Sequence, residues 1–207
     1  SIFNAIFGML LAWIITRYRF PGRKFLDGLM DLPFALPTAV AGLTLATLFS
    51  TQGWYGLVLD KFDIKVINTW IGIAVAMSFT SLPFVVRTVQ PVLEELGPEY
   101  EEAAETLGAN RWQTFRKVVL PELSPALLAG TALSFTRSLG EFGAVIFIAG
   151  NIAWQTEVVS LMIFIRLQEF DYPAASAVAS VILLVSLVLL FSINGLQSRF
   201  GKRLRGH

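Results

Sequence analysis

Few side chains of this 207-residue chain could do chemistry. There is no cysteine, and the single histidine is the terminal His207, so the chain offers neither a catalytic thiol nor a His and Cys cluster that could bind a metal. Its serines have no neighbouring base, and the stretch from Gly195 to Arg203 lacks the spacing of a phosphate-binding loop. We therefore predict a protein that is not an enzyme, holds no metal or cofactor, and does not itself bind ATP.

Arg137 and Glu141 are ionisable side chains in an unusual setting, because they interrupt a largely apolar run over residues 123–149. A spacing of four residues puts them on one face of a helix, shared with Ser134 and Ser138, and lets them form an ion pair. Inside a membrane such a pair faces protein or water rather than lipid. Two interpretations are open: a structural ion pair between packed helices, or the polar lining and gate of a path for an anion.

A strongly charged segment stands between apolar stretches in the middle of the chain. Pro98 can open a helix with an acidic first turn, and Gly108 can end that helix in the left-handed conformation. Asn110 and Gln113 have the spacing of a reciprocal cap for a second helix, which Pro121 is expected to end or kink. The sequence predicts two short helices joined by a glycine elbow.

We call residues 98–121 the charged island. Its first helix carries two adjacent alanines, and its second helix carries Trp112 and Phe115, three residues apart. Aromatic side chains on one side of so short a helix need an apolar surface to cover them. The island is therefore either a docking element for a soluble partner or a solvated loop between helices.

The run from Glu102 to Pro121 resembles the EAA loop of the permease subunits of bacterial ABC importers. Glu-Ala-Ala begins it, Gly108 follows Ala104 by four residues, and Leu120 precedes the terminal proline. The likeness covers nearly the whole chain and extends to the T-type permease subunits of sulfate/thiosulfate importers, with W-type subunits and molybdate permeases as close relatives. The stretches that carry it are residues 32–45, residues 134–151 and the tail from residue 193.

The resemblance implies an all-α integral membrane protein with the helical bundle of a type I ABC importer permease, moving sulfate or thiosulfate across the bacterial inner membrane. It implies as partners two ATP-binding subunits, a second permease subunit of the W type, a periplasmic sulfate/thiosulfate-binding protein and membrane lipid; no nucleic acid is expected. Two alternatives stay open: a permease of this family for another oxyanion such as molybdate, or a stand-alone anion channel or secondary transporter. The residues assigned to coupling with the ATPase are Glu102, Ala103, Ala104, Leu107, Gly108, Arg111, Trp112 and Phe115.

The composition is that of an integral membrane protein: 55% of the residues are hydrophobic, 15% are charged, and the mean hydropathy is +0.64. We predict one transmembrane domain over residues 1–207. The apolar run from Val158 to Ile165 is too short to cross a bilayer and is expected to form an external or re-entrant helix. The five predicted spans are about residues 1–16, 29–49, 69–86, 123–149 and 174–196.

Basic residues set the orientation, because they gather at cytoplasmic ends of spans. They are Arg17, Arg19, Arg23, Lys24, Arg87, Arg199, Lys202, Arg203 and Arg205. This pattern places the charged island in the cytoplasm. Pro33 and Pro37 predict a bend or an unwound turn at the entry of the second span. Because the chain begins at Ser1 within an apolar stretch, we expect a further helix of the family to precede it.

Overall fold

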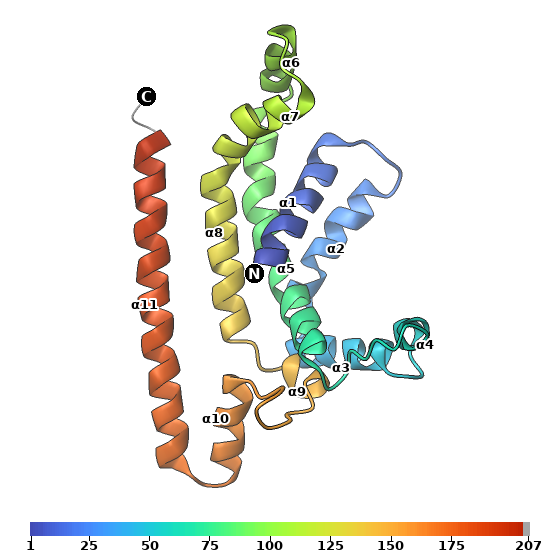
Figure 1. The fold of residues 1–207 in the computed structure, drawn as a ribbon, viewed down its shortest axis with the longest axis vertical. Coiled ribbons are helices and arrows are strands. Elements are labelled where there is room, and N and C mark those ends of the chain that lie inside the picture. The colour runs from blue at the N-terminus through green and yellow to red at the C-terminus, as the bar shows by residue number, and fades with distance from the viewer. Residues whose placement is uncertain (205–207) are drawn as a thin grey trace. The chain divides into compact units, whose positions relative to one another are not determined.

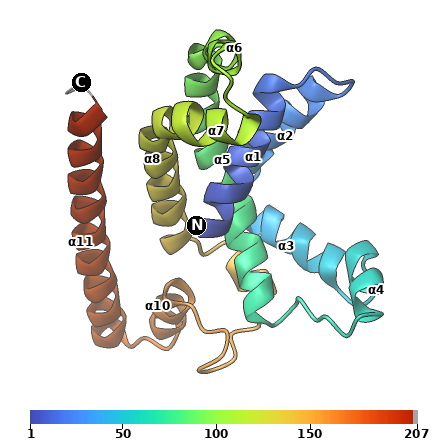
Figure 2. The same cartoon turned by 45° about the horizontal axis from the view of Figure 1, so that its top comes forward.

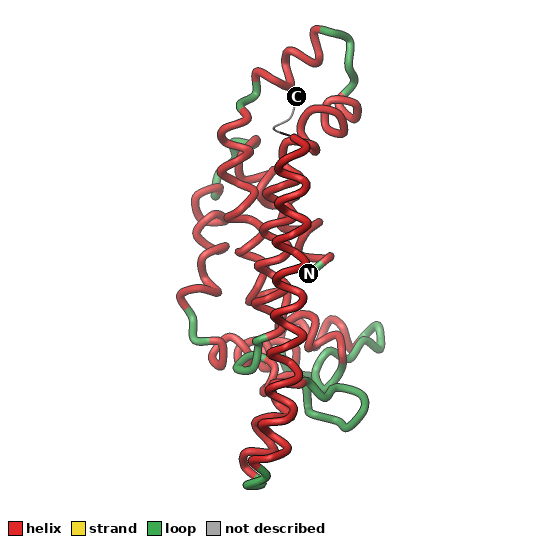
Figure 3. The backbone as a smooth tube through the Cα atoms, turned by 90° about the vertical axis from the view of Figure 1, so that its left-hand side faces the viewer, coloured by secondary structure: helices red, strands yellow, loops and turns green. Residues whose placement is uncertain are grey.

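The computed structural model describes residues 1–204, and every regular element in that range is helical (Figures 1 and 3). Arg205 and His207 lie outside the described residues, as do the side chains of Arg199, Lys202 and Arg203. The elements are α1 (Ile2–Arg17), α2 (Arg23–Ala35), α3 (Thr38–Phe49), α4 (Trp54–Asp60), α5 (Trp70–Leu96), α6 (Glu99–Thr106), α7 (Arg111–Thr114), the π-helical turn η1 (Phe115–Val119), α8 (Leu120–Leu139), α9 (Val145–Ile148), α10 (Val159–Gln168) and α11 (Tyr172–Leu204).

The chain forms two compact units, each with its own core. The first comprises Ser1–Met30, Leu82–Phe135 and Phe191–His207, and the second comprises Asp31–Ser81 and Thr136–Leu190. The boundaries between the units fall inside α2, α5, α8 and α11.

The core of the first unit lies where α1, α5 and α8 meet. Val85 is fully buried at this point, and both neighbouring helices meet it with a glycine. A Cβ added at Gly8 would lie 2.8 Å from the Val85 Cβ, and one added at Gly130 would lie 2.9 Å from the Val85 Cα. Small residues thus allow the three helices to approach at backbone distance, as in other membrane bundles.

The core of the second unit is built around α9, which packs against α3. A Cβ added at Gly42 would lie only 2.5 Å from the Ala144 Cα, and one added at Gly143 would lie 2.9 Å from the Ala39 N atom. The small residues at positions 143 and 144 therefore permit α3 to approach the start of α9 closely. Gly140 has no neighbour within 4 Å, so it does not contribute to this contact.

The predicted bend in the second span is present. Helices α2 and α3 meet at an angle of 116° across a short break, and Pro37 is the N-cap residue of α3. Pro33 stays inside α2. The break therefore lies at the second proline, which has no N–H to continue the hydrogen-bond ladder of the preceding helix.

Three helices in the described part of the chain are long and apolar enough to cross a membrane, and the bent α2–α3 pair would make a fourth. They are Trp70–Leu96, Arg111–Leu139 and Tyr172–Ser192, while α1 and α10 are shorter apolar helices. Arg87 lies within α5, and not beyond its end as the sequence suggests. The five-span arrangement stays a prediction, since it depends on where the bilayer lies.

Candidate functional site

The first helix of the charged island ends as the sequence predicts. Helix α6 has Pro98 as its N-cap residue and three glutamates in its first turn, where the helix dipole favours negative charge. Gly108 follows with a φ of +81°, and its N–H donates to the Glu105 carbonyl over 2.9 Å. Few residues other than glycine adopt this left-handed conformation without strain, so the elbow is confirmed.

The second helix begins as predicted but does not stop. Asn110 Oδ1 accepts from the Gln113 N–H over 2.9 Å, and Gln113 Oε1 accepts from the Asn110 N–H over 3.0 Å, which completes the capping box. Pro121 does not end the helix, because α7 passes through the π-helical turn η1 into α8. A proline fits inside a helix where the preceding backbone moves off its ring, and a π turn widens the backbone at that point.

The predicted coupling residues separate into two groups. Leu107 is 89% exposed and Trp112 is 66% exposed, so two large apolar side chains of the island lie largely uncovered. Glu102, Ala103, Gly108 and Arg111 are also exposed, and Ala104 is half-buried. Phe115 instead turns inward, where its ring meets the Trp13 ring of α1 edge to face at 5.8 Å (Figure 2 shows α7 beside α1). The exposed group forms a surface, whereas Phe115 holds that surface to the first unit.

Arg17, which the sequence marks only as a basic anchor, joins the island to α1. Its Nη2 atom lies 2.8 Å from Glu101 Oε1 in the first turn of α6. The same nitrogen donates to the Gly97 carbonyl over 3.3 Å. Local periodicity cannot reveal such a contact, because 80 residues separate Arg17 from Gly97.

Arg137 and Glu141 form the predicted ion pair, with 2.9 Å between Arg137 Nη1 and Glu141 Oε2. The Glu141 side chain is fully buried, while that of Arg137 is 31% exposed. The other Glu141 carboxylate oxygen accepts from the Ala144 N–H over 2.9 Å, and Ser160 Oγ donates to the Glu141 carbonyl over 2.7 Å. The predicted common helical face is wrong for Glu141, since α8 ends at Leu139 and the pair spans the break between α8 and α9.

The two serines of the predicted face take different partners. In the first unit, Asn4 Nδ2 donates to the buried Ser134 Oγ over 3.1 Å, which ties α1 to α8. In the second unit, Ser138 Oγ donates to Ser81 Oγ of α5 over 3.0 Å. Ser138 therefore belongs with Arg137 and Glu141, whereas Ser134 serves a helix–helix contact.

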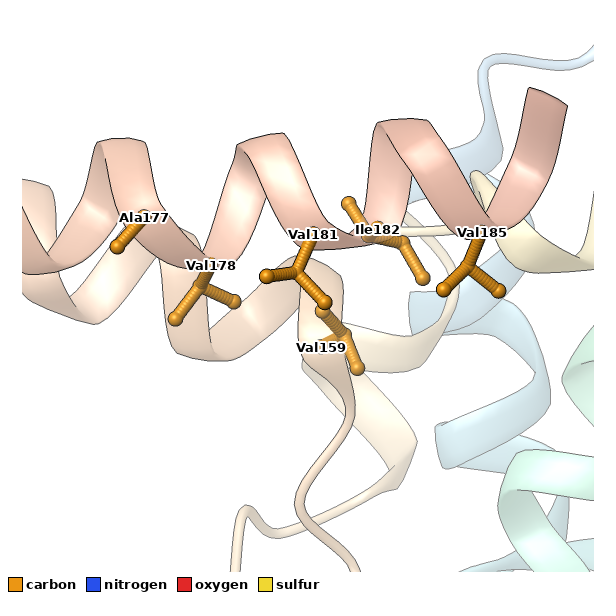
Figure 4. Close-up of a pocket in the computed structure, with 6 residues that line it drawn as sticks. All are labelled: Val159, Ala177, Val178, Val181, Ile182 and Val185. Carbon is orange, nitrogen blue, oxygen red and sulfur yellow. The ribbon is translucent and has the colours of Figure 1, made fainter. Parts of the chain in front are cut away.

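A pocket of about 320 Å³ between α10 and α11 has an apolar lining (Figure 4). The side chains that line it are Val159, Ala177, Val178, Val181, Ile182 and Val185, all of them hydrocarbon. A dianion needs donors to replace its water, so this surface suits lipid or another apolar helix instead.

The sequence has close relatives of known description. It is 83% identical to the "Sulfate transport system permease protein CysT" of Escherichia coli K12 over 207 residues, which is all of this chain and 75% of that protein. It is 82% identical to the protein of the same description from Salmonella typhimurium, again over all of this chain and 75% of that protein. A "Probable sulfate transport system permease protein cysT" from Chlorokybus atmophyticus is 51% identical over 96% of this chain and 69% of the relative.

Solved structures share the fold at low sequence identity. A bacterial ABC transporter that imports alginate superposes with a TM-score of 0.76 at 21% identity, over 96% of this chain and 73% of that chain. The MetNI methionine ABC transporter gives a TM-score of 0.67 at 18% identity, over 96% of this chain and 88% of that chain. The profile of the family described as "Binding-protein-dependent transport system inner membrane component" matches residues 4–206. The chain therefore belongs to this family of inner membrane permease subunits of ABC importers, with their type I fold.

Proposed function

We propose that this chain is the transmembrane subunit of an ATP-driven importer that moves sulfate, and with it thiosulfate, across the bacterial inner membrane. The observation that carries the choice of cargo is the 83% identity, over the whole chain, to a protein described as a sulfate transport system permease. Divergence this small leaves most of a translocation path unchanged. The partly exposed Arg137 guanidinium supplies the type of donor that a tetrahedral dianion needs.

The importer needs partners that this chain does not supply. ATP is hydrolysed on two separate ATP-binding subunits, a second W-type permease subunit completes the pore, and a periplasmic binding protein delivers the anion. Support comes from the family description, which makes transport binding-protein-dependent, and from a related alginate importer solved in complex with a periplasmic protein. The chain itself holds no cofactor in this proposal, and its described residues contain no group of three or more His, Cys, Asp or Glu side chains that could hold a metal ion.

The exposed surface of the charged island docks on the ATP-binding subunits. Leu107 and Trp112 supply apolar anchors, and Arg111 beside them supplies a charge at the rim, a combination typical of interface hot spots. The Gly108 elbow sets the angle between the two helices. Movement of the ATP-binding subunits would reach this chain through a lever of packed helices.

Arg137 lines the anion path in this proposal, and Glu141 positions it. The buried carboxylate engages one end of the guanidinium, and a guanidinium has five N–H donors. The partly exposed remainder of Arg137 can therefore pair with a sulfate oxygen while Glu141 keeps the side chain in place. Because Glu141 offsets the charge of Arg137, the path also holds a dianion less tightly, and a transported ion must be released again.

The test is transport by the complete importer in proteoliposomes. Detergent extraction of the tagged chain should co-purify an ATPase and a second permease subunit, and the reconstituted complex should hydrolyse ATP faster when sulfate-loaded binding protein is added. Uptake of labelled sulfate should compete with thiosulfate. Competition by molybdate at equal concentration, or sulfate passage without ATP, would contradict the proposal.

A further inference from the structure

Arg17 meets three parts of the first unit at one point. It is the last residue of α1, so its positive charge lies at the end of the helix where the dipole favours a cation. Its guanidinium contacts Glu101 in the first turn of α6 and the Gly97 carbonyl in the turn between α5 and α6. That turn is itself constrained, since Gly97 has a φ of +61°.

The same arginine also connects to the second helix of the charged island through aromatic rings. The Arg17 Cζ atom lies 5.7 Å from the centre of the Trp13 ring. The Trp13 ring meets Phe115 at 5.8 Å, and Phe115 stacks on Trp112 at the same separation. An unbroken series of contacts therefore leads from Glu101 on α6, through α1, to the exposed Trp112 on α7.

This joint differs from an ordinary surface ion pair. Exposed pairs contribute little because water and salt screen them, but the Arg17 side chain is only 14% exposed and Glu101 25% exposed. Separating the two groups would leave charge in a half-buried setting, so movement that keeps them together is favoured. Both helices of the island thus contact α1, one through the Arg17–Glu101 pair and the other through the aromatic rings.

We propose that the Arg17–Glu101 pair is the joint through which movement of the charged island is passed to α1, with Arg17 as a positioning residue for coupling. The inference rests on the proposed function, because it needs an ATP-driven partner that pushes the island. The proposal gives α1 a part in transmitting the movement of the ATP-binding subunits, in addition to the direct connection of α7 with α8.

Glu101→Gln tests the joint in the complete importer, reconstituted with its partner permease, ATPase and binding protein. This variant removes the ion pair but changes no basic residue, so the positive-inside signal for insertion is intact. Glu105→Gln, one turn further along α6 and exposed, is the matched control. Arg17→Gln and the double variant Arg17→Gln/Glu101→Gln complete a cycle, with exposed Arg19→Gln as the control for the arginine.

The measured quantity is the ratio of sulfate taken up to ATP hydrolysed. If the contact only stabilised the protein, its removal would leave this ratio unchanged in complexes that had assembled. We expect Glu101→Gln to lower this ratio about 5-fold or more, the lower end of the usual range for coupling between sites. Arg17→Gln should do the same, and the double variant should be no worse than the poorer single one. Glu105→Gln and Arg19→Gln should match the unmodified protein. A ratio in Glu101→Gln equal to that of Glu105→Gln would overturn the proposal.

Two further measurements keep the outcome clear. If Arg17→Gln fails to insert, Arg17→Lys keeps the charge but lacks the planar guanidinium that lies over the Trp13 ring while it pairs with Glu101, and it should show a partial loss of coupling. The distance between spin labels on Arg19→Cys and Glu105→Cys should be the same in the nucleotide-free and ATP-trapped states. The distribution of that distance should broaden in Glu101→Gln. If the unmodified importer shows no sulfate-stimulated ATP hydrolysis, the proposed function fails and not the joint.

Discussion

Glu141 holds two groups at once, the Arg137 guanidinium and the Ala144 N–H, and neither contact reaches solvent on the glutamate side. Arg137→Ala should therefore destabilise the chain by about 3–5 kcal/mol, because it leaves a buried carboxylate without its counter-charge. The double variant Arg137→Ala/Glu141→Ala should recover most of the lost stability. Thermal unfolding of the purified complexes in detergent measures this order of stability, with the Arg137→Ala variant expected to melt first.

The same pair of variants separates a structural role from a role in the path. A double variant that folds but takes up no sulfate supports the path, since the anion has lost its donor. Full uptake by the double variant would reject a necessary role for the pair in transport.

Close backbone packing at Gly42 offers a second test at the level of one residue. Gly42→Ala puts a methyl group 2.5 Å from the Ala144 Cα, and overpacking of this kind costs about 1–3 kcal/mol. Gly28→Ala is the matched control, because nothing lies within 4 Å of its added Cβ and alanine favours a helix by about 1 kcal/mol. We expect a lower melting temperature for the first variant and an equal or higher one for the second. A melting temperature for Gly42→Ala as high as that of Gly28→Ala would mean that α3 and α9 do not pack this closely.

Residue patterns predict local geometry well and distant contacts poorly. The Asn110–Gln113 cap and the Gly108 elbow follow from neighbours in the sequence, and both are present. The partners of Arg17, Ser134 and Ser138 depend on how helices from remote parts of the chain pack, which periodicity does not encode.

At the scale of elements, the elbow is the feature most open to test. Nothing lies within 4 Å of a Cβ added at Gly108, so the effect of Gly108→Val comes from the backbone alone, at about 1–3 kcal/mol for its left-handed φ. The second helix should swing and carry Arg111 and Trp112 off the partner surface. We expect normal insertion in the membrane but loss of sulfate uptake.

Gly108→Asn is the control for that variant, since asparagine tolerates the left-handed conformation and should retain most uptake. Equal, normal uptake by the valine and asparagine variants would show that the angle of the elbow does not matter for coupling.

Helix limits are predictable only where a residue enforces them. Pro37 caps α3 as a proline should, but Pro33 and Pro121 are accommodated inside helices. The end of α8 at Leu139 is not marked by proline, and it follows from the way Glu141 and the close contact of Gly143 with α3 hold the next turn. Tertiary contacts thus override the apolar run that suggested one long span over residues 123–149.

For the whole molecule, orientation in the membrane is the property to measure. The chain has no cysteine, so single reporters can be placed freely. Lys61→Cys and Ala153→Cys, both exposed, should react with an impermeant thiol reagent added outside the inner membrane. Asn110→Cys and Glu105→Cys on the charged island should react only after permeabilisation. Labelling of Asn110→Cys from outside in intact cells would show that the predicted orientation in the membrane is wrong.

Hydropathy predicts an integral membrane protein, and the resemblance of the run from Glu102 to Pro121 to an EAA loop implies the type I permease fold, which is confirmed. Hydropathy alone does not show which helices cross the membrane as single straight spans. Packing decides this for the bent α2–α3 pair and for the short helices α1 and α10. The division into two compact units likewise has no signal in composition, since its boundaries lie within helices.

The π turn at Phe115–Val119 has a mechanical consequence for the surface that carries Trp112. A π turn holds one more residue than an α turn, and each residue advances a helix by about 100°. Loss of the extra residue would rotate α7 about its axis relative to α8 while the backbone stays helical. If the turn lost that residue during transport, the docking surface would twist about the axis of α7 in addition to being pushed. Deletion of Val118 should convert the π turn into an α-helical turn and rotate Phe115 away from Trp13. A short thiol cross-linker should therefore join Trp13→Cys to Phe115→Cys in the chain that keeps Val118, but not in the deletion variant.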